Sequence, residues 1–148
     1  RDPLWSRGLG DVYKRQYLDG LAGAGLLPAD PAARLLAERR QALGDGFLDA
    51  LLLYRQERNK PVDKQTPAWL DAFALKTRAV LAVLEAEAPA LRASRFDLGL
   101  IAIGCALSYL DYRFPDLAWR DGHPALAAWH QDFSARPSVQ RSQPDDTP

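Results

Sequence analysis

The residues of this sequence that could do chemistry are few, and their spacing is typical of structural groups. Cys105 is the only cysteine and lies in an apolar stretch, where burial raises the pKa of a thiol and makes it a poor nucleophile. His123 and His130 have no further ligands at the spacing of a zinc site, so we predict no metal centre. Asp45 and Asp49 stand four residues apart, but we expect them on a solvated helix face or at a contact across a dimer axis. The sequence holds no phosphate-binding loop, nucleophile elbow or His-Glu-x-x-His motif.

Composition excludes several classes of function. The chain has 148 residues, 47% of them hydrophobic, which is typical of one soluble globular domain. Its 19 basic and 19 acidic residues cancel, so we predict neither a nucleic-acid nor a membrane partner. A single cysteine rules out an internal disulfide framework. The longest apolar run is too short and too often interrupted to span a membrane, and no signal peptide opens the chain, so we expect a cytoplasmic protein.

Capping residues followed by proline divide the chain into helices. Asp30 and Thr66 each precede a proline, and a cap followed by proline is a strong signal for a helix start. His123 precedes Pro124, and we expect it to act as a local cap. We therefore predict helices over residues 31–58, 67–88, 95–113 and 124–135. Pro89 is expected to follow the end of the second of these helices.

The helix predicted over residues 95–113 is the most apolar and should lie in the core, because it is apolar almost all round. Ser94 and Asp97 have the spacing of a capping box, in which each side chain accepts a hydrogen bond from the backbone N–H of the other. Gly44 and Gly46 on the preceding long helix indicate a bend or the close approach of another backbone. No segment alternates with period two. The fold class is therefore all-α, a helical bundle with a central buried helix.

The two ends of the chain differ from the rest. Residues 1–16 show no helical or strand period, and their RGLGDVYKRQ string looks like a translated sequencing adapter, so we expect this segment to be non-native. The chain also contains no methionine. Residues 17–28 look like the last turn of a helix and a linker. The helical domain is predicted over residues 29–139, and residues 140–148 form a loose polar tail.

The order and spacing of several motifs resemble the C-terminal all-α domain of the cytosolic glutathione transferases, in a bacterial subgroup. The ALGDGFLDA segment of residues 42–50 is similar to a bacterial segment of the first helix of that domain. The Ser94-x-x-Asp97 pattern is similar to the family's capping box. The stretch from His123 to Ser138 resembles the family's ending, with its His-Pro, Trp129, Phe133 and Arg-Pro-Ser elements.

This resemblance implies a thioredoxin-like N-terminal domain, of which only residues 17–28 would be present here. In the family that domain binds glutathione, the co-substrate, and carries the residue that activates its thiol. The resemblance therefore implies no catalytic residue in this chain. It implies a wall of the electrophile pocket made by Phe47, Tyr54, Tyr109 and Tyr112. It also implies a homodimer in which Arg34, Glu38 and Asp45 contact the second subunit.

The function that follows is the helical half of an enzyme that conjugates glutathione to small hydrophobic electrophiles or uses it to reduce them. The chain alone should be inactive and should expose apolar surface on its first long helix and its central helix. The alternative is a non-catalytic binding or scaffold domain, because the transferase fold is also used without catalysis. An open pocket lined by Tyr54 and Tyr112 would favour the enzyme, and a filled one the scaffold.

Overall fold

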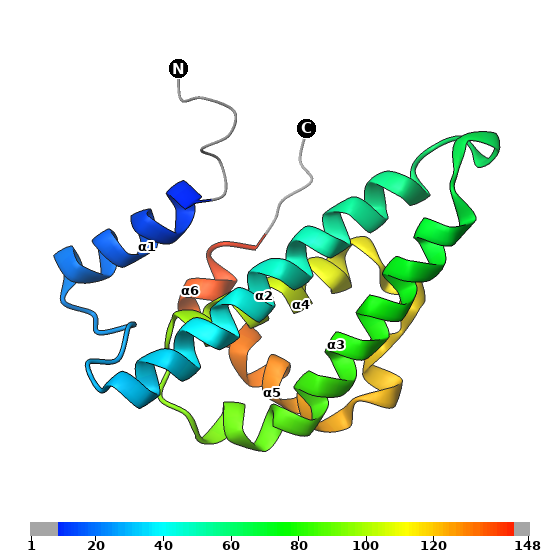
Figure 1. The fold of residues 1–148 in the computed structure, drawn as a ribbon. Helices are drawn as coiled ribbons and strands as arrows, with labels where there is room; N and C mark the ends of the chain where they lie inside the picture. The colour runs from blue at the N-terminus through cyan, green and yellow to red at the C-terminus, as the bar shows by residue number, and fades with distance from the viewer. Residues whose placement is uncertain (1–8, 144–148) are drawn as a thin grey trace.

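The computed structural model describes residues 9–143, and every regular element among them is helical. The main helices are α1 (Leu9–Ala22), α2 (Pro31–Arg58), α3 (Pro67–Ala93), α4 (Leu98–Arg113) and α5 (Pro124–Ser134). Short elements complete the chain: η2 (Val62–Lys64), η3 (Pro115–Leu117), η4 (Trp119–Gly122) and α6 (Pro137–Gln140). The predicted fold class is confirmed, and the long helices α2 and α3 run antiparallel along one side of the bundle (Figure 1).

Helix starts follow the sequence closely at α2 and less closely elsewhere. The Asp30 carboxylate accepts a hydrogen bond from the Ala33 N–H at 2.8 Å, and Pro31 occupies the first turn, as predicted. At α3 the helix begins at Pro67 as predicted, but the Thr66 side chain makes no capping bond. Instead, the Thr66 N–H donates to the carboxylate of Glu57, at 2.7 Å.

The second long helix continues further than predicted. Pro89 lies inside α3, which ends at Ala93 rather than Ala88. A proline removes one backbone donor, but here it lies on the exposed side of the helix. Ala88 and Leu91, which are 2% and 1% exposed, bury the opposite side and hold the last turn against the core.

The central helix α4 lies against α2 at very short backbone distance. A Cβ atom added at Gly44 would lie 2.6 Å from the backbone carbon of Ala102. A Cβ atom added at Gly99 would lie 2.5 Å from the Ala37 carbonyl oxygen. The close approach predicted from the glycines is therefore confirmed at Gly44, whereas a Cβ at Gly46 would meet nothing within 4 Å.

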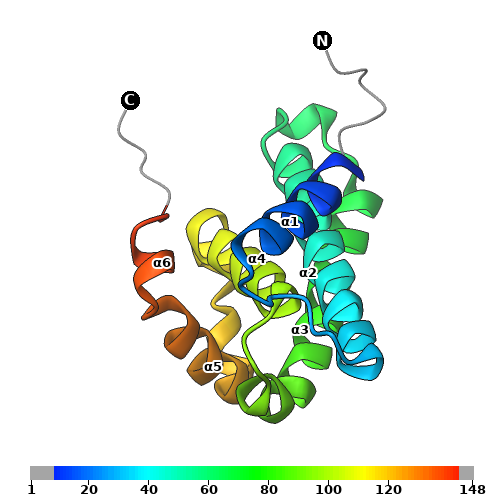
Figure 2. The ribbon, with the colours of Figure 1, turned by 90° about the vertical axis from the view of Figure 1, so that its left-hand side faces the viewer.

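The helix α1 lies at the side of the bundle formed by α2 and α4 (Figure 2). Arg15 on α1 donates to both carboxylate oxygens of Asp45 on α2, at 3.2 and 2.8 Å. Asp19, at the other end of α1, accepts from the backbone N–H groups of Leu26 and Leu27, at 2.7 and 2.9 Å. The Arg15–Asp45 ion pair therefore links α1 to α2, and the Asp19 carboxylate links α1 to the segment that follows it.

The predicted boundaries at the two ends fall partly outside the described residues. The helix α1 begins at Leu9, upstream of the predicted boundary at residue 17, and residues 1–8 lie outside the described part. That residues 1–16 are non-native stays a prediction. Of the tail predicted at 140–148, Gln140 belongs to α6, a short helix that we did not predict. Residues 144–148 lie outside the described part.

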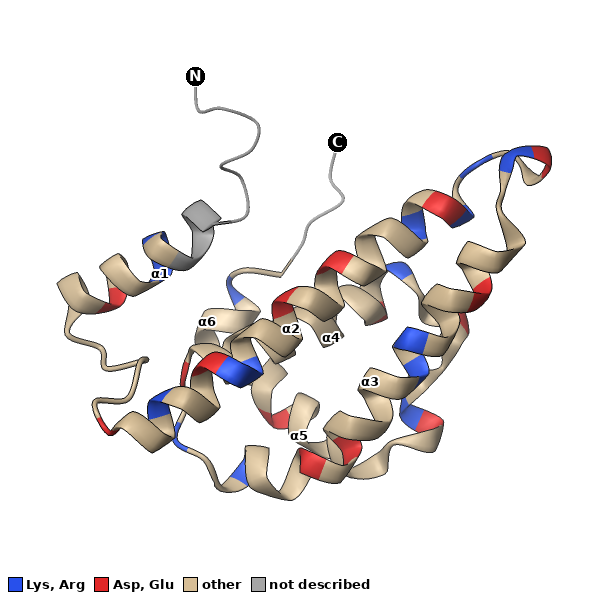
Figure 3. Cartoon of the chain, in the orientation of Figure 1, with Lys and Arg blue, Asp and Glu red and all other residues tan. Residues whose placement is uncertain are grey.

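Charged side chains are distributed over all the long helices (Figure 3). Acidic and basic groups are interspersed, and several pair across elements, for example Arg39 with Glu87 at 2.5 Å and Arg58 with Asp116 at 2.8 Å. Most of these groups are substantially exposed, so each pair contributes little to stability. Within residues 9–143, no helix is long and apolar enough to cross a membrane.

Candidate functional site

A cavity of about 360 Å³ lies between α4, η4, α5 and the chain around α6. The central helix contributes Cys105, Ser108, Asp111 and Tyr112, and the other side contributes Arg120, His130 and Phe133. Three of the α4 residues fall at steps of three and four, which places them on one stripe of the helix. The buried helix thus turns its polar stripe towards the last part of the bundle.

A chain of polar contacts runs along the wall of this cavity. Asp111 accepts from the indole N–H of Trp119 at 2.7 Å and pairs with the guanidinium of Arg120, whose Nη2 is 2.6 Å from Oδ2. The same Nη2 lies 3.0 Å from Nδ1 of His130. Nε2 of His130 lies 3.1 Å from Oγ of Ser108. Residues from α4, η4 and α5 are therefore joined in one network.

The protonation of His130 follows from its neighbours. A guanidinium can only donate, so Nδ1 facing Arg120 must be the accepting nitrogen and the neutral ring carries its proton on Nε2. The side chain is 3% exposed, and burial lowers its pKa, while Asp111 acts to raise it and Arg120 to lower it. His130 is therefore neutral at pH 7.

Ser108, His130 and Asp111 stand in the order of a hydrolytic triad, with Nδ1 of His130 3.6 Å from Oδ2 of Asp111. The proton is on the wrong nitrogen for that chemistry. A triad needs an Nε2 that can accept the serine proton, whereas here Arg120 occupies Nδ1 and Nε2 carries the hydrogen. The arrangement holds a hydroxyl in place and does not make it a nucleophile.

The four aromatic residues predicted to line a substrate pocket separate in the structure. Tyr112 lines the cavity. Phe47 and Tyr54 lie in the core instead, 2% and 8% exposed, and the ring of Tyr54 stacks on Phe114 at 5.3 Å. Tyr109 is half-buried, and its hydroxyl oxygen is buried without a hydrogen-bond partner. Contact of any of them with a substrate stays a prediction.

Tyr54, which we expected to line a pocket together with Tyr112, is not among the residues that line this cavity. It lies on the side of α2 that faces α3 and the end of α4, between Phe73 and Phe114. A late position in a helix does not reveal which side is covered by the neighbouring helices.

The capping box predicted at Ser94 and Asp97 is corrected by the structure. Helix α4 begins at Leu98, so Asp97 is its N-cap and accepts from the Leu100 N–H at 2.9 Å. Ser94 belongs to the end of α3, where its hydroxyl donates to the Ala90 carbonyl at 2.7 Å and accepts from Arg40 at 2.8 Å. Helix α4 therefore has a side-chain cap, but the capping residue is Asp97, three residues after the Ser94 that the capping box would require.

The residues expected at a dimer contact lie on α2. Arg34 and Glu38 form an ion pair one turn apart, at 2.9 Å, and both side chains are accessible. Asp45 is bound within the chain by Arg15. Their contact with a second subunit stays a prediction.

Cys105 is exposed rather than buried, contrary to expectation, because it lies on the stripe of α4 that lines the cavity. Partial loss of hydration still raises the pKa of its thiol, with Arg15 opposing and Asp45 adding to the effect. The thiol is protonated at pH 7 and therefore weakly nucleophilic. Among residues 9–143 no three potential metal ligands come together.

Sequence reasoning missed the roles of Ser108, Asp111 and Arg120. The signal available was the spacing of the polar residues on α4. It could not be used alone, because the partners His130 and Arg120 come from elements that meet α4 only in the folded bundle.

The comparisons with known proteins agree with this architecture. Residues 67–132 match the family described as "Glutathione S-transferase, C-terminal domain". The Escherichia coli (strain K12) protein described as "Uncharacterized GST-like protein YibF" is 31% identical over 121 residues, which cover 80% of this chain and 60% of that protein.

Solved structures extend the similarity to three dimensions. A glutathione transferase family member from Pseudomonas fluorescens Pf-5, solved with bound S-(propanoic acid)-glutathione, is 47% identical, with a TM-score of 0.76 over 81% of this chain and 62% of that one. A glutathione S-transferase from Methylobacterium radiotolerans JCM 2831, in complex with glutathione sulfonate, is 34% identical, with a TM-score of 0.80 over 93% of this chain and 66% of that one.

The fold is thus the all-α bundle of a glutathione transferase C-terminal domain. Over this helical domain the chain is similar to members of the glutathione transferase family. It spans 60% of the length of the Escherichia coli relative and 62% of the first Pseudomonas structure.

Proposed function

We propose that this chain is the helical half of a glutathione transferase that joins glutathione to small hydrophobic electrophiles or uses it to reduce them. The observation that carries the proposal is the 47% identity to a protein solved with glutathione and with S-(propanoic acid)-glutathione. Binding of the tripeptide and activation of its thiol are assigned to a thioredoxin-like domain. This chain supplies the wall for the second substrate, and the open cavity at Tyr112 is the candidate.

The proposal includes a homodimer and a cytoplasmic location. Large apolar side chains are exposed on α2, where Leu35 and Leu53 are 69% and 51% exposed, and burial against a second copy would remove them from water. The charged pair of Arg34 and Glu38 lies on the same helix.

A fusion protein tests the enzymatic proposal. The thioredoxin-like domain of the Pseudomonas fluorescens protein is joined ahead of Tyr17, and conjugation of glutathione to 1-chloro-2,4-dinitrobenzene is followed by absorbance. We expect the fusion protein to catalyse this conjugation, and we expect the 148-residue chain alone to show no activity. In the fusion, Tyr112→Phe should raise KM for the aryl halide, whereas Tyr54→Phe, a matched change in the core, should leave KM unchanged.

The non-catalytic alternative has a different outcome in the same experiment. A folded fusion that binds glutathione but conjugates neither the aryl halide nor an enone would favour a binding or scaffold domain. Turnover by the 148-residue chain alone would contradict the proposed division of labour.

A further inference from the structure

Ser108 differs from Thr77 and Ser94 in how it uses its hydroxyl proton. Thr77 and Ser94 each donate to the carbonyl four residues earlier, at 2.9 and 2.7 Å, which is the usual arrangement for a helical hydroxyl. Ser108 does not. Its one hydrogen-bond partner among the described residues is Nε2 of His130, at 3.1 Å.

The direction of that hydrogen bond is fixed from the far side of the imidazole. Because Arg120 donates to Nδ1 of His130, Nε2 carries the hydrogen and Oγ of Ser108 is the acceptor. The carbonyl of Gly104, four residues before Ser108, faces His130 as well. Within residues 9–143, the bond with His130 is the one hydrogen bond of the Ser108 hydroxyl, so its proton is left without an acceptor there, and the side chain lines the cavity.

The network also strengthens this hydroxyl as a donor. A cationic guanidinium at Nδ1 draws electron density from the ring and makes the Nε2–H a better donor to Oγ, which in turn polarises the O–H bond. Asp111 forms an ion pair with Arg120 and lines the same cavity. The site therefore offers a polarised neutral donor beside a carboxylate, which disfavours an anionic ligand.

We propose that the cavity binds a small apolar molecule with a neutral carbonyl group, and that the hydroxyl of Ser108 donates a hydrogen bond to the carbonyl oxygen. His130 and Arg120 are positioning residues that act through Ser108. The cavity, at about 360 Å³, has room for one aromatic ring with a short substituent, and Tyr112 and Phe133 supply apolar walls. Carbonyl compounds as the substrate class of the transferase rest on the proposed function, whereas the binding itself does not.

Two probes of nearly equal shape test the proposal on the full 148-residue chain. Acetophenone has a C=O group where α-methylstyrene has C=CH₂, and their dissociation constants are measured by titration of ¹⁵N-labelled protein followed by NMR. The wild type is expected to bind the ketone about fivefold more tightly, the contribution of one ordinary hydrogen bond. Equal affinities, or no binding of either probe, would overturn the proposal.

Matched variants locate the effect. Ser108→Ala should reduce the ratio of the two affinities to about one, whereas Ser134→Ala, which changes another hydroxyl that lines the cavity, should retain the wild-type ratio. A ketone preference that survives in Ser108→Ala would overturn the proposal. Because the ratio compares two ligands on one protein, a partial loss of fold lowers both affinities and leaves the ratio interpretable.

The tautomer of His130 gives a readout that needs no ligand. Long-range ¹H–¹⁵N correlation spectra of the wild type should show the proton on Nε2, and an Nδ1 proton would overturn the assignment. Arg120→Met should move the proton to Nδ1, which faces Oδ2 of Asp111 at 3.6 Å, and should abolish the ketone preference. An unchanged tautomer in this variant would remove Arg120 from the proposal.

The outcomes separate this inference from the proposed function. A ketone preference that depends on Ser108, together with an inactive fusion protein, would reject the transferase and retain the site. An active fusion protein with no ketone preference would support the transferase and reject the proposed carbonyl site.

Discussion

At the scale of single residues, the carboxylate of Glu57 organises the turn between α2 and α3. One oxygen accepts from the Thr66 N–H at 2.7 Å and the other from Nζ of Lys60 at 2.6 Å. The side chain is 3% exposed. The hydrogen bond from Lys60, followed by that from Thr66, lowers the pKa of Glu57 below its ordinary value of 4.5. One carboxylate thus ties Lys60 in the turn and the backbone N–H of Thr66, the residue before α3, to the end of α2.

The lowered pKa fixes the pH dependence of this contribution. A carboxyl group whose pKa is lower in the folded state stabilises the fold above its unfolded pKa, and the contribution is lost as the pH falls through the folded pKa. We expect Glu57→Gln to lower the urea midpoint at pH 7 and to have a much smaller effect near pH 3. Asp63→Asn, in the exposed turn nearby, is the control and should change neither. An equal effect of Glu57→Gln at both pH values would contradict the ionic role.

Individual site residues were predictable only where a local rule governs them. Asp30 was predictable because a cap and the helix it starts are neighbours in sequence. The positions of Tyr54 and Tyr112 depend instead on which neighbouring helix covers each side, and residues far along the chain decide that. The donor direction at Ser108 depends on Arg120 through His130, a relation that no local spacing encodes.

At the scale of elements, helix α5 starts with help from another helix. His123 was predicted to cap it, but Nδ1 of His123 bonds to the Trp119 carbonyl at 2.6 Å and the residue makes no capping bond. Glu85 on α3 takes that role, with its two oxygens 3.0 and 2.7 Å from the N–H groups of Ala125 and Leu126. A carboxylate at a helix N-terminus satisfies free donors and also interacts favourably with the helix dipole.

Removal of this contact should loosen α5 from α3. We expect Glu85→Ala to lower the free energy of unfolding by about 1–2 kcal/mol, the range for loss of a helix cap, as measured by urea denaturation. Glu38→Ala changes a carboxylate on α2 that pairs only with the exposed Arg34 and should cost less than about 0.5 kcal/mol. Equal losses in the two variants would show that Glu85 does not cap α5.

The packing of α2 on α4 gives a second test at this scale. A Cβ atom at Gly44 would meet backbone atoms of α4, whereas one at Gly46 would meet nothing. Gly44→Ala should therefore destabilise the fold by about 1–3 kcal/mol. Gly46→Ala should stabilise it by up to about 1 kcal/mol, because alanine is the better helix former. Thermal unfolding of the two variants measures this difference. A stabilised Gly44→Ala variant would mean that α2 and α4 are further apart than in the structure.

Element boundaries show the limit of local signals. Proline predicts helix starts well, because its fixed φ suits the first turn, and α2, α3 and α5 all begin at one. It fails as a stop signal at Pro89, where packing of Leu91 outweighs one missing hydrogen bond. The start of α4 moved by three residues because the Asp97 carboxylate, and not the Ser94 hydroxyl, accepts a backbone N–H of its first turn, while Ser94 donates back to the Ala90 carbonyl of α3.

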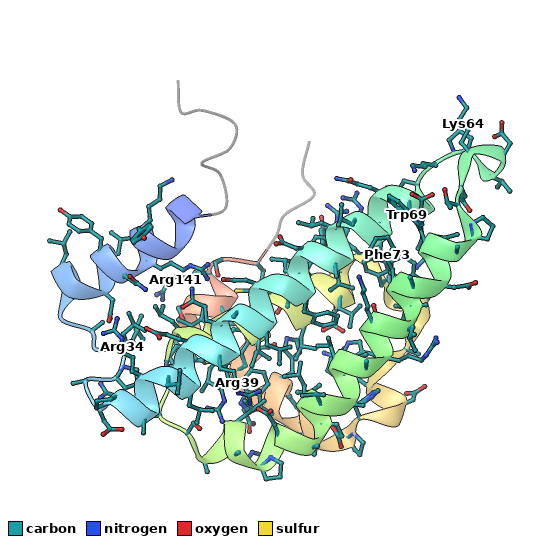
Figure 4. All side chains as sticks on the ribbon, viewed as in Figure 1. Arg34, Arg39, Lys64, Trp69, Phe73 and Arg141 are labelled. Carbon is teal, nitrogen blue, oxygen red and sulfur yellow. The ribbon has the colours of Figure 1, made fainter. Side chains whose placement is uncertain are left out.

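At the scale of the whole molecule, large apolar side chains remain in contact with solvent. We predicted this for the first long helix and the central helix. It holds for α2, with Leu35 and Leu53, but the large apolar side chains of α4 are buried or half-buried. Other exposed apolar groups lie on α1, with Tyr17 and Leu21, on α3, and on η2, with Val62. Figure 4 shows Trp69 and Phe73 on α3, towards the turn that carries Lys64.

Apolar groups on α2 should make the isolated chain associate with itself, because burial of one leucine side chain contributes about 1.5–3 kcal/mol. We expect concentration-dependent dimerisation in sedimentation experiments and enhanced fluorescence of a hydrophobic dye. Leu35→Lys with Leu53→Lys should weaken dimerisation at least tenfold. Gln56→Lys, which adds the same charge at an exposed polar position of α2, should have little effect. A chain that stays monomeric and binds no dye would mean that this surface needs no partner, and the proposed homodimer would lose its physical basis.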